Sequence, residues 1–167
     1  TVVIKVKDTL KAYQEVAAYW RLKLDIPVIA VTGSTGKTTT KDIIAAALGT
    51  SMEVLKSYAN FNNEIGVPAT LLQLNQSYQA VVLEMGMRGL GQIRELTEIA
   101  KPTIGVVTNV GKTHMELLGS IGNIASAKQE LVEELDEQSI VVLNFDDENV
   151  KNMEKVAKGK VVFFGCS

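Results

Sequence analysis

The feature that most constrains this chain is a glycine-rich segment between a strand pattern and a helix pattern. The apolar run Val28–Val31 predicts a buried strand, and apolar residues recur at helical spacing from Gly36-Lys-Thr38 to Leu48. Such a turn points backbone N–H groups at an anion, and the helix N-terminus adds partial positive charge. The segment therefore predicts a binding site for a nucleoside triphosphate.

The loop is shorter than the usual phosphate-binding motif. That motif would place a glycine at position 31, where this chain has Val31, so the form here is Gly-x-x-Gly-Lys-Thr. We expect Lys37 to reach the outer phosphates and the Thr38 hydroxyl to bind magnesium. A chance Gly-Lys-Thr on a surface turn is the alternative. The residues expected to bind the nucleotide are Gly33, Ser34, Thr35, Gly36, Lys37, Thr38, Thr39 and, from a later loop, Asn63.

Short apolar strands alternate with helical patterns along the rest of the chain. We expect strands at 53–56, 79–85, 103–108, 140–143 and 161–164, and helices at 67–74, 92–100, 121–135 and 149–157. This alternation predicts an α/β fold of the phosphate-loop NTPase type, with a mostly parallel sheet and helices on both faces.

The N-terminal part alternates weakly over residues 1–6, which predicts an edge strand. A helix is expected to start at Asp8-Thr9. Its apolar face is expected to consist of Leu10, Tyr13, Val16, Ala17 and Trp20.

Length and composition exclude several classes of protein. The 167 residues suit one domain, and a net charge of −2 without a basic block argues against nucleic acid as a partner. No apolar run approaches the roughly 20 residues that span a membrane, and no secretory signal is visible. The single cysteine, Cys166, excludes an internal disulfide. We therefore expect a cytoplasmic monomer that does not bind a membrane, cut from a longer protein.

Two candidate metal ligands follow strands at the sheet edge where ligands bind. Glu84 ends the apolar run from Ala80, a position typical of a magnesium-binding carboxylate, although it could instead cap the following turn. His114 follows the strand at 103–108 and is either a metal ligand or a histidine with an ordinary loop hydrogen bond. It cannot belong to a zinc cluster, because the chain has no second histidine and one cysteine.

A lysine interrupts the apolar stripe of the helix at 121–135. Lys128 occupies the stripe position between Ala125 and Leu131, so its side chain must extend to water, pair with an acid or stay neutral with a lowered pKa. A neutral amine can react with carbon dioxide to give a carbamate, whose oxygens resemble those of a carboxylate and can bind a metal. Extension to water is the interpretation that the sequence alone favours.

Other polar groups have two possible roles each. The amides of a loop could hold phosphate or magnesium-bound water, or form an ordinary turn: Asn60, Asn62 and Asn63. Asp146 and Asp147 could contact the nucleotide or cap the next helix, and for Asp147 we favour capping. Arg88 is expected to be a solvated loop charge. The chain has no Asn-Lys-x-Asp guanine-binding motif, which argues against a GTPase.

Six segments, in order, resemble those of the central ATPase domain of the Mur ligases, the amide-forming enzymes of peptidoglycan precursor synthesis. They are Thr32-Gly-Ser-Thr-Gly-Lys-Thr-Thr39, Asn60-Phe-Asn-Asn-Glu-Ile-Gly-Val-Pro68, Leu83-Glu-Met-Gly-Met-Arg-Gly89, His114-Met-Glu-Leu-Leu-Gly-Ser120, Ala127-Lys-Gln-Glu130 and Asn144-Phe-Asp-Asp147. The second and third segments most resemble the branch that adds D-alanyl-D-alanine to UDP-N-acetylmuramoyl-tripeptide. The resemblance implies that residues 1–25 end a preceding domain and that 26–167 form an incomplete central ATP-binding domain.

The resemblance also implies roles. Lys37 and the loop amides would hold the β- and γ-phosphates of ATP, and Thr38 the first Mg²⁺. Glu84 and His114 would help to hold a metal that bridges the γ-phosphate and the substrate carboxylate. Lys128 matches the lysine that many members carry as a carbamate, so the residues implied in catalysis are Lys37, His114 and Lys128.

In the implied reaction, the tripeptide carboxylate attacks the γ-phosphorus, and the D-alanyl-D-alanine amine then attacks the acyl phosphate. The chain lacks counterparts of the family's nucleotide-sugar domain, of its adenine-contacting segment and of its C-terminal domain. We therefore expect these residues to bind nucleotide weakly and not to ligate. The alternatives are a ligase similar to folylpolyglutamate synthase and a non-catalytic phosphate-loop module used in assembly.

Overall fold

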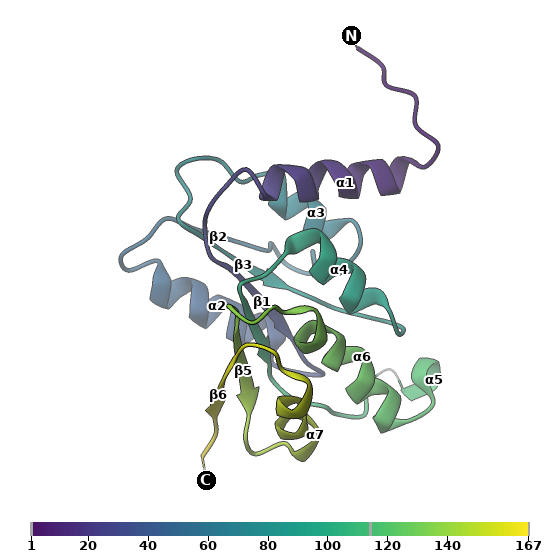
Figure 1. The fold of residues 1–167 in the computed structure, drawn as a ribbon, viewed down its shortest axis with the longest axis vertical. Coiled ribbons are helices and arrows are strands. Elements are labelled where there is room, and N and C mark those ends of the chain that lie inside the picture. Colours follow the sequence, from purple (N-terminus) through teal and green to yellow (C-terminus); the bar gives the residue numbers. More distant parts are fainter. Residues whose placement is uncertain (1, 114, 167) are drawn as a thin grey trace.

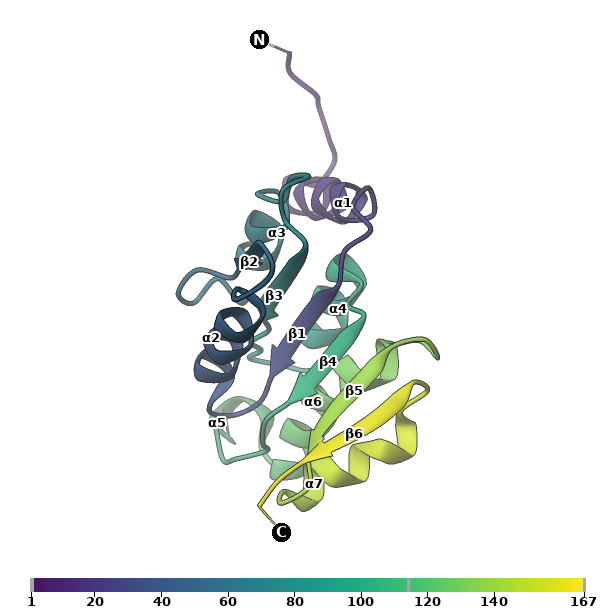
Figure 2. The ribbon, with the colours of Figure 1, turned by 90° about the vertical axis from the view of Figure 1, so that its left-hand side faces the viewer.

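A computed structural model describes residues 2–113 and 115–166. At its centre is a six-stranded sheet in the order β2-β3-β1-β4-β5-β6 (Figures 1 and 2). The strands are β1 (Val28–Thr32), β2 (Val54–Lys56), β3 (Ala80–Glu84), β4 (Ile104–Val107), β5 (Ile140–Asn144) and β6 (Lys160–Phe164). Every strand pair is parallel, which confirms the predicted fold class and brings all carboxyl ends to one edge.

Helices cover both faces of the sheet. They are α1 (Thr9–Arg21), α2 (Lys37–Leu48), α3 (Gly66–Leu71), α4 (Gln92–Ala100), α5 (Met115–Leu118), α6 (Ile121–Glu134), α7 (Glu148–Lys151) and the 3-10 segment η1 (Asn152–Val156). Helix α2 lies on one face, while α4 and α6 lie on the other (Figure 2). Successive residues of β1 therefore enter different apolar clusters, Ile29 and Val31 on the α2 side and Val28 and Ala30 on the other. None of the helices in the described ranges has the length and apolarity needed to cross a bilayer.

The helix boundaries confirm most predictions, and α4 has the predicted bounds. The predicted helix at 149–157 is instead the single turn α7 followed by η1. At that junction, the Asn152 side chain donates to the Glu148 carbonyl at 2.7 Å, and such local bonds compete with a regular helix. Helix α5 was not predicted, because four residues are too few to show a helical period.

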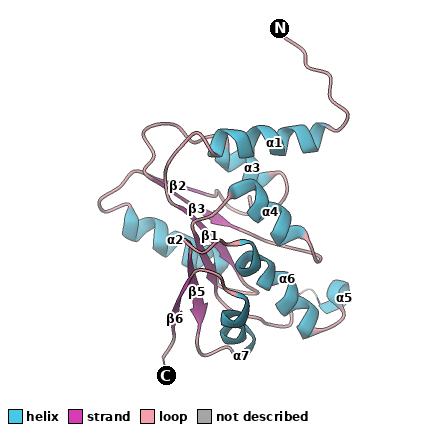
Figure 3. Ribbon diagram, in the orientation of Figure 1, coloured by secondary structure: helices cyan, strands magenta, loops and turns pink. Residues whose placement is uncertain are grey.

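The edge strand expected at residues 1–6 is wrong for its described part. Residues 2–6 form no strand and lead as a loop to α1 (Figure 3). The side chains of Val2, Val3 and Ile4 are largely exposed, so no sheet edge or core covers them. The helix itself starts as predicted, because the Asp8 carboxylate accepts the Lys11 N–H at 2.9 Å.

The apolar face predicted for α1 is confirmed at Ala17 but wrong at Leu10, Val16 and Trp20, which are exposed. Its buried residues are Gln14, Ala17 and Arg21, whereas Leu10 and Trp20 are 40% and 39% exposed. The reason is that α1 packs against loop and helix ends that offer backbone carbonyls. Gln14 donates to Glu64 O, and Arg21 donates to Ala100 O at the end of α4. Polar side chains thus occupy the buried face because each one finds an acceptor there.

Candidate active site

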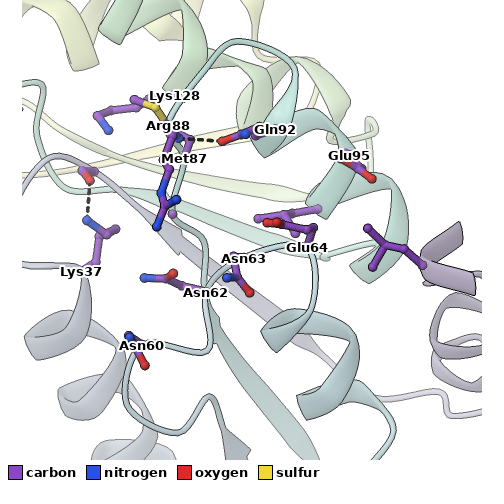
Figure 4. Close-up of a pocket in the computed structure, with 14 residues that line it drawn as sticks. Lys37, Asn60, Asn62, Asn63, Glu64, Met87, Arg88, Gln92, Glu95 and Lys128 are labelled. Atoms are coloured by element: carbon purple, nitrogen blue, oxygen red, sulfur yellow. Dashed lines mark hydrogen bonds between the residues drawn. The ribbon is translucent and has the colours of Figure 1, made fainter. Parts of the chain in front are cut away.

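The loop glycines, Glu84 and Lys128, all predicted site residues that the structure describes, meet at the carboxyl edge of the sheet. The glycine-rich loop follows β1, Glu84 ends β3, and Lys128 reaches the same place from α6. A cavity of about 470 Å³ opens there, and Gly33, Lys37 and Lys128 line it with part of the Asn-rich loop (Figure 4). The crevice lies where a parallel α/β sheet places its ligands.

The two loop glycines are required by the backbone. Gly33 has φ +150°, and a Cβ at that position would overlap the Thr108 hydroxyl at the end of β4. Gly36 has φ +78° and is the N-cap residue of α2. A side chain is therefore excluded at the first position by space and disfavoured at the second by conformation.

The loop is held by the segment that follows β4, a contact that the sequence analysis missed. Asn109 Oδ1 accepts the Thr35 N–H at 2.9 Å, and Asn109 Nδ2 donates to Thr35 Oγ1 at 3.0 Å. Thr108 Oγ1 donates to the Thr35 carbonyl at 2.7 Å. Ser34 Oγ accepts the Gly111 N–H at 2.8 Å. Polar residues directly after a buried strand were the available signal, since neighbouring parallel strands end side by side.

The start of α2 is prepared for an anion. No side chain caps it, so the first N–H groups have no partner within the helix. Lys37 Nζ bends back over the loop and donates to Gly33 O at 2.9 Å. A cation and free N–H groups thus surround the space above the loop, as the prediction of a phosphate site requires.

Thr38 and Glu84 are brought together as predicted. Thr38 Oγ1 donates to Glu84 Oε2 at 2.7 Å, and Asn62 Nδ2 donates to Glu84 Oε1 at 2.8 Å. The carboxylate is only 3% exposed. Hydroxyl and carboxylate oxygens are hard ligands that suit Mg²⁺, which commonly takes one or two protein oxygens together with phosphate. The pair therefore fits a magnesium ion bound with a nucleotide.

A second set of contacts, also missed, fixes the end of β3. The Ser57 hydroxyl accepts the Glu84 N–H at 3.2 Å. Lys41, on the same helix as Thr38 and 2% exposed, donates from Nζ to the Ser57 carbonyl at 2.8 Å. Helix α2 therefore holds Glu84 directly through Thr38 and indirectly through Lys41 and Ser57.

Lys128 is buried rather than extended to water, so the interpretation that the sequence favoured is wrong. Its residue is 2% exposed, and within the described ranges its amine has no hydrogen bond or ion pair. Burial, which is the larger cause, and the positive charge of Lys37 together lower its pKa from 10.5 to about 8. About one-tenth of the amine is then neutral at pH 7, which fits the chemistry of carbamate formation.

The remaining predicted residues are placed as follows. Asn63 Oδ1 accepts the Gly66 N–H at 2.9 Å at the start of α3, and Asn63 also lines the cavity. Asp147 caps α7 as predicted, and Asp146 accepts the Cys166 N–H at 2.8 Å. Arg88 is exposed but lines the cavity. His114 lies outside the described residues.

Comparison with known proteins identifies the family. Residues 31–167 match the Mur ligase middle domain. The chain is 50% identical over 161 residues to UDP-N-acetylmuramoyl-tripeptide–D-alanyl-D-alanine ligase of Synechocystis, covering 96% of this chain and 36% of that protein. The corresponding ligase of Bacillus subtilis is 45% identical over 150 residues, covering 90% of this chain and 33% of that protein. The chain thus spans about a third of the length of these relatives.

Solved structures agree. MurF from Acinetobacter baumannii superposes with a TM-score of 0.93 at 32% identity, covering 97% of this chain and 36% of that one. MurF from Thermotoga maritima, solved in complex with ADP, gives a TM-score of 0.90 at 31% identity, covering 99% and 40%. Escherichia coli FolC is more distant, at 14% identity with a TM-score of 0.69, and shares the fold. The match over residues 31–167 and these relatives place the chain in the Mur ligase family, as a middle domain of that family.

Proposed function

We propose that this chain is the ATP-binding part of a MurF-type ligase, which joins D-alanyl-D-alanine to UDP-N-acetylmuramoyl-tripeptide in peptidoglycan synthesis. The observation that carries the proposal is the hydrogen bond of 2.7 Å between Thr38 and Glu84. It lies beside the phosphate loop, whose Lys37 lines the same cavity as Lys128. This hydrogen bond supports the proposal because Thr38 and Glu84 would then offer oxygen ligands for a metal next to the γ-phosphate. The relatives at 50% and 45% identity carry this activity in their names.

The protein's part in the reaction is to bring two anions together. The tripeptide carboxylate attacks the γ-phosphorus of ATP, and the bond between this phosphorus and the β–γ bridging oxygen breaks. ADP departs, and the peptide carboxylate has become an acyl phosphate. The amine of D-alanyl-D-alanine then attacks the acyl carbon, loses a proton and expels inorganic phosphate. Lys37 and the N–H groups of α2 would stabilise the charge on the transferred phosphoryl group.

Thr38 and Glu84 would hold the Mg²⁺, which supplies charge neutralisation between phosphate and carboxylate. We propose His114 as a further ligand. Lys128, as a carbamate, would add oxygen ligands of the same kind, and its burial beside Lys37 is what supports this role. A ¹³C signal from labelled bicarbonate that disappears in Lys128→Met would test the carbamate without an activity assay.

We expect ligation to need the full-length protein, meaning this chain with the flanking parts that its relatives have. We expect the 167-residue chain to bind Mg·ATP weakly in calorimetry and to release no phosphate with tripeptide and D-alanyl-D-alanine. The full-length protein should ligate them. Robust turnover by the short chain would contradict the assignment of roles, and failure of the full-length protein with these substrates would contradict the proposed function.

Two alternatives are weaker. A ligase similar to folylpolyglutamate synthase shares the fold, but the resemblance of FolC rests on 14% identity. A substrate panel of UDP-sugar peptide against folate separates the two ligases. A non-catalytic assembly module would have no use for a buried Lys128 that lies beside the phosphate loop and has no partner among the described residues. In the full-length protein, Lys37→Ala should abolish ligation, whereas a module used only for assembly would keep its partners.

A further inference from the structure

The cavity extends past the phosphate loop, and its walls differ in charge. Lys37, Lys128 and Arg88 are at one end, whereas Glu64 and Glu95 line the part farther from the loop (Figure 4). We propose that Arg88 binds the reacting carboxylate of the peptide substrate in this cavity. This inference rests on the proposed function. It assigns the binding of the peptide substrate to a residue outside the phosphate loop.

The backbone that carries Arg88 is held in place. Gln92 Oε1 accepts the N–H groups of Arg88 at 2.6 Å and Gly89 at 3.3 Å. The buried Glu130 of α6 accepts the Gly91 N–H at 2.6 Å and the Arg94 N–H at 3.0 Å. The loop is thus fastened to α4 and α6, the helix that carries Lys128. A side chain on such a support can orient a ligand, because its backbone is fixed before the ligand arrives.

The Arg88 guanidinium lacks a partner within the described ranges. It points into the cavity toward the space between Lys37 and Asn62 (Figure 4), and none of its donors makes a hydrogen bond or ion pair with a described residue. The other arginines are occupied. Arg94 pairs with Glu133 and Glu134, and Arg21 donates to backbone carbonyls. Arg88 therefore has its whole donor set available for a ligand.

The charge pattern favours a carboxylate over a second phosphate. Lys37 and the α2 N–H groups already provide for the γ-phosphate. A guanidinium presents a planar fork that matches a carboxylate with two parallel hydrogen bonds. Glu64 and Glu95 repel an anion from the far end of the cavity, so a carboxylate that enters the cavity would be directed toward Arg88 and Lys37.

Both possible ligands are oxyanions, so the test must separate them. In the full-length protein, calorimetry measures UDP-N-acetylmuramoyl-tripeptide alone and Mg·ATP alone. We expect Arg88→Gln to weaken tripeptide binding by about 10- to 100-fold, with Mg·ATP affinity changed less than about 3-fold. Arg88→Lys should lie between, because it keeps the charge and loses the fork. Arg94→Gln is the matched control, since Arg94 does not line the cavity.

A tripeptide whose reacting carboxylate is replaced by a carboxamide sharpens the test. It should bind the wild type about as weakly as the acid binds Arg88→Gln, and Arg88→Gln should weaken it no further. Loss of Mg·ATP affinity alone, or unchanged tripeptide affinity in Arg88→Gln, would overturn the inference. A wild type that does not bind the tripeptide would instead contradict the proposed function. The Arg88 side chain makes no contact that folding needs, so circular dichroism should show unchanged melting.

Discussion

The phosphate loop and the neighbouring wall of the cavity, which Lys128 and Arg88 form, are built in contrasting ways. The loop is satisfied before any ligand arrives, because Asn109, Thr108 and Gly111 bond its backbone and side chains. The wall formed by Lys128 and Arg88 is not: within the described ranges neither cation has a counter-ion. The phosphate loop is thus preformed, whereas the positive charges of Lys128 and Arg88 are not balanced by a described residue.

The two regions therefore contribute differently to the binding of phosphate and of the substrate carboxylate. A preformed loop holds phosphate with little reorganisation, which supports affinity. The buried charge of Lys128 destabilises the empty protein and is relieved when anions enter, whereas the exposed Arg88 is solvated until a ligand binds. This wall therefore favours the state in which phosphate and carboxylate are both present. Four substitutions test whether the two regions behave so differently, two of them, Lys37→Ala and Lys128→Met, with readouts added to those given above.

The largest effect is expected for Lys37→Ala in the full-length protein. Ligation should fall by about 1,000-fold or more, because the cation that faces the transferred phosphoryl group is lost. Melting should be unchanged, since Lys37 bonds only carbonyls of its own loop. Phosphate release and circular dichroism measure the two. Lys56→Ala, which removes a half-exposed lysine paired with Asp42, is the control and should stay within about 2-fold. Activity of Lys37→Ala close to that of the wild type would show that the loop has a structural role and no part in ligation.

Gly33→Ala tests whether the loop is preformed. The new Cβ would overlap the Thr108 hydroxyl, so we expect about 2–3 kcal/mol of destabilisation in urea unfolding. Gly89→Ala is the matched control, because a Cβ there meets no atom within 4 Å. Combining Gly33→Ala with Thr108→Ala should recover part of the loss. Equal stability of the two glycine variants would mean that the segment that follows β4 does not hold the loop.

Lys128→Met tests the wall of the cavity that lacks counter-ions. Unlike Gly33→Ala, it should raise the free energy of unfolding. Burial and the nearby charge of Lys37 lower the pKa of Lys128 from 10.5 to about 8, so below pH 8 folding must bury a charged amine. Removing that charge should stabilise the ligand-free chain by about 1–3 kcal/mol at pH 7 while ligation is lost. A variant less stable than wild type at pH 7 would show that the charge is compensated.

The pH dependence has a definite sign. Between about pH 8 and 10.5 the unfolded chain binds more protons than the folded chain, so wild-type stability should rise with pH across this window. Lys128→Met should lack this component of the rise. Urea unfolding from pH 6 to 10.5 measures it, with the exposed Lys11→Met as a control that keeps the wild-type slope.

The smallest effect is expected for Asn109→Ala. It removes three hydrogen bonds to Thr35 and should lower stability by about 1–2 kcal/mol, with Mg·ADP affinity reduced by about 10-fold in calorimetry. Asn75→Ala removes a comparable amide from a surface turn and should leave nucleotide affinity unchanged. Equal nucleotide affinity in both variants would show that Asn109 does not hold the loop in its nucleotide-binding conformation.

The local signals in the sequence were sufficient for the fold class and for most elements. The periodicity around β1 and α2 and the glycine spacing are properties of adjacent residues, so they could be predicted without a structure. The face of α1 could not. Gln14 and Arg21 are buried because carbonyls from Glu64 and Ala100 meet them, and those acceptors lie far away in the sequence.

What the sequence determined by itself was the parallel α/β architecture, the phosphate loop and the candidacy of Glu84 and Lys128, since each depends on a pattern within one element. Only the tertiary structure decided that Lys128 is buried without a described partner, that Asn109 holds the loop, and that Arg88 points into the cavity. The physical reason is that burial, pairing and charge balance are set by neighbours brought together from different crossover units, and no local pattern contains those distances.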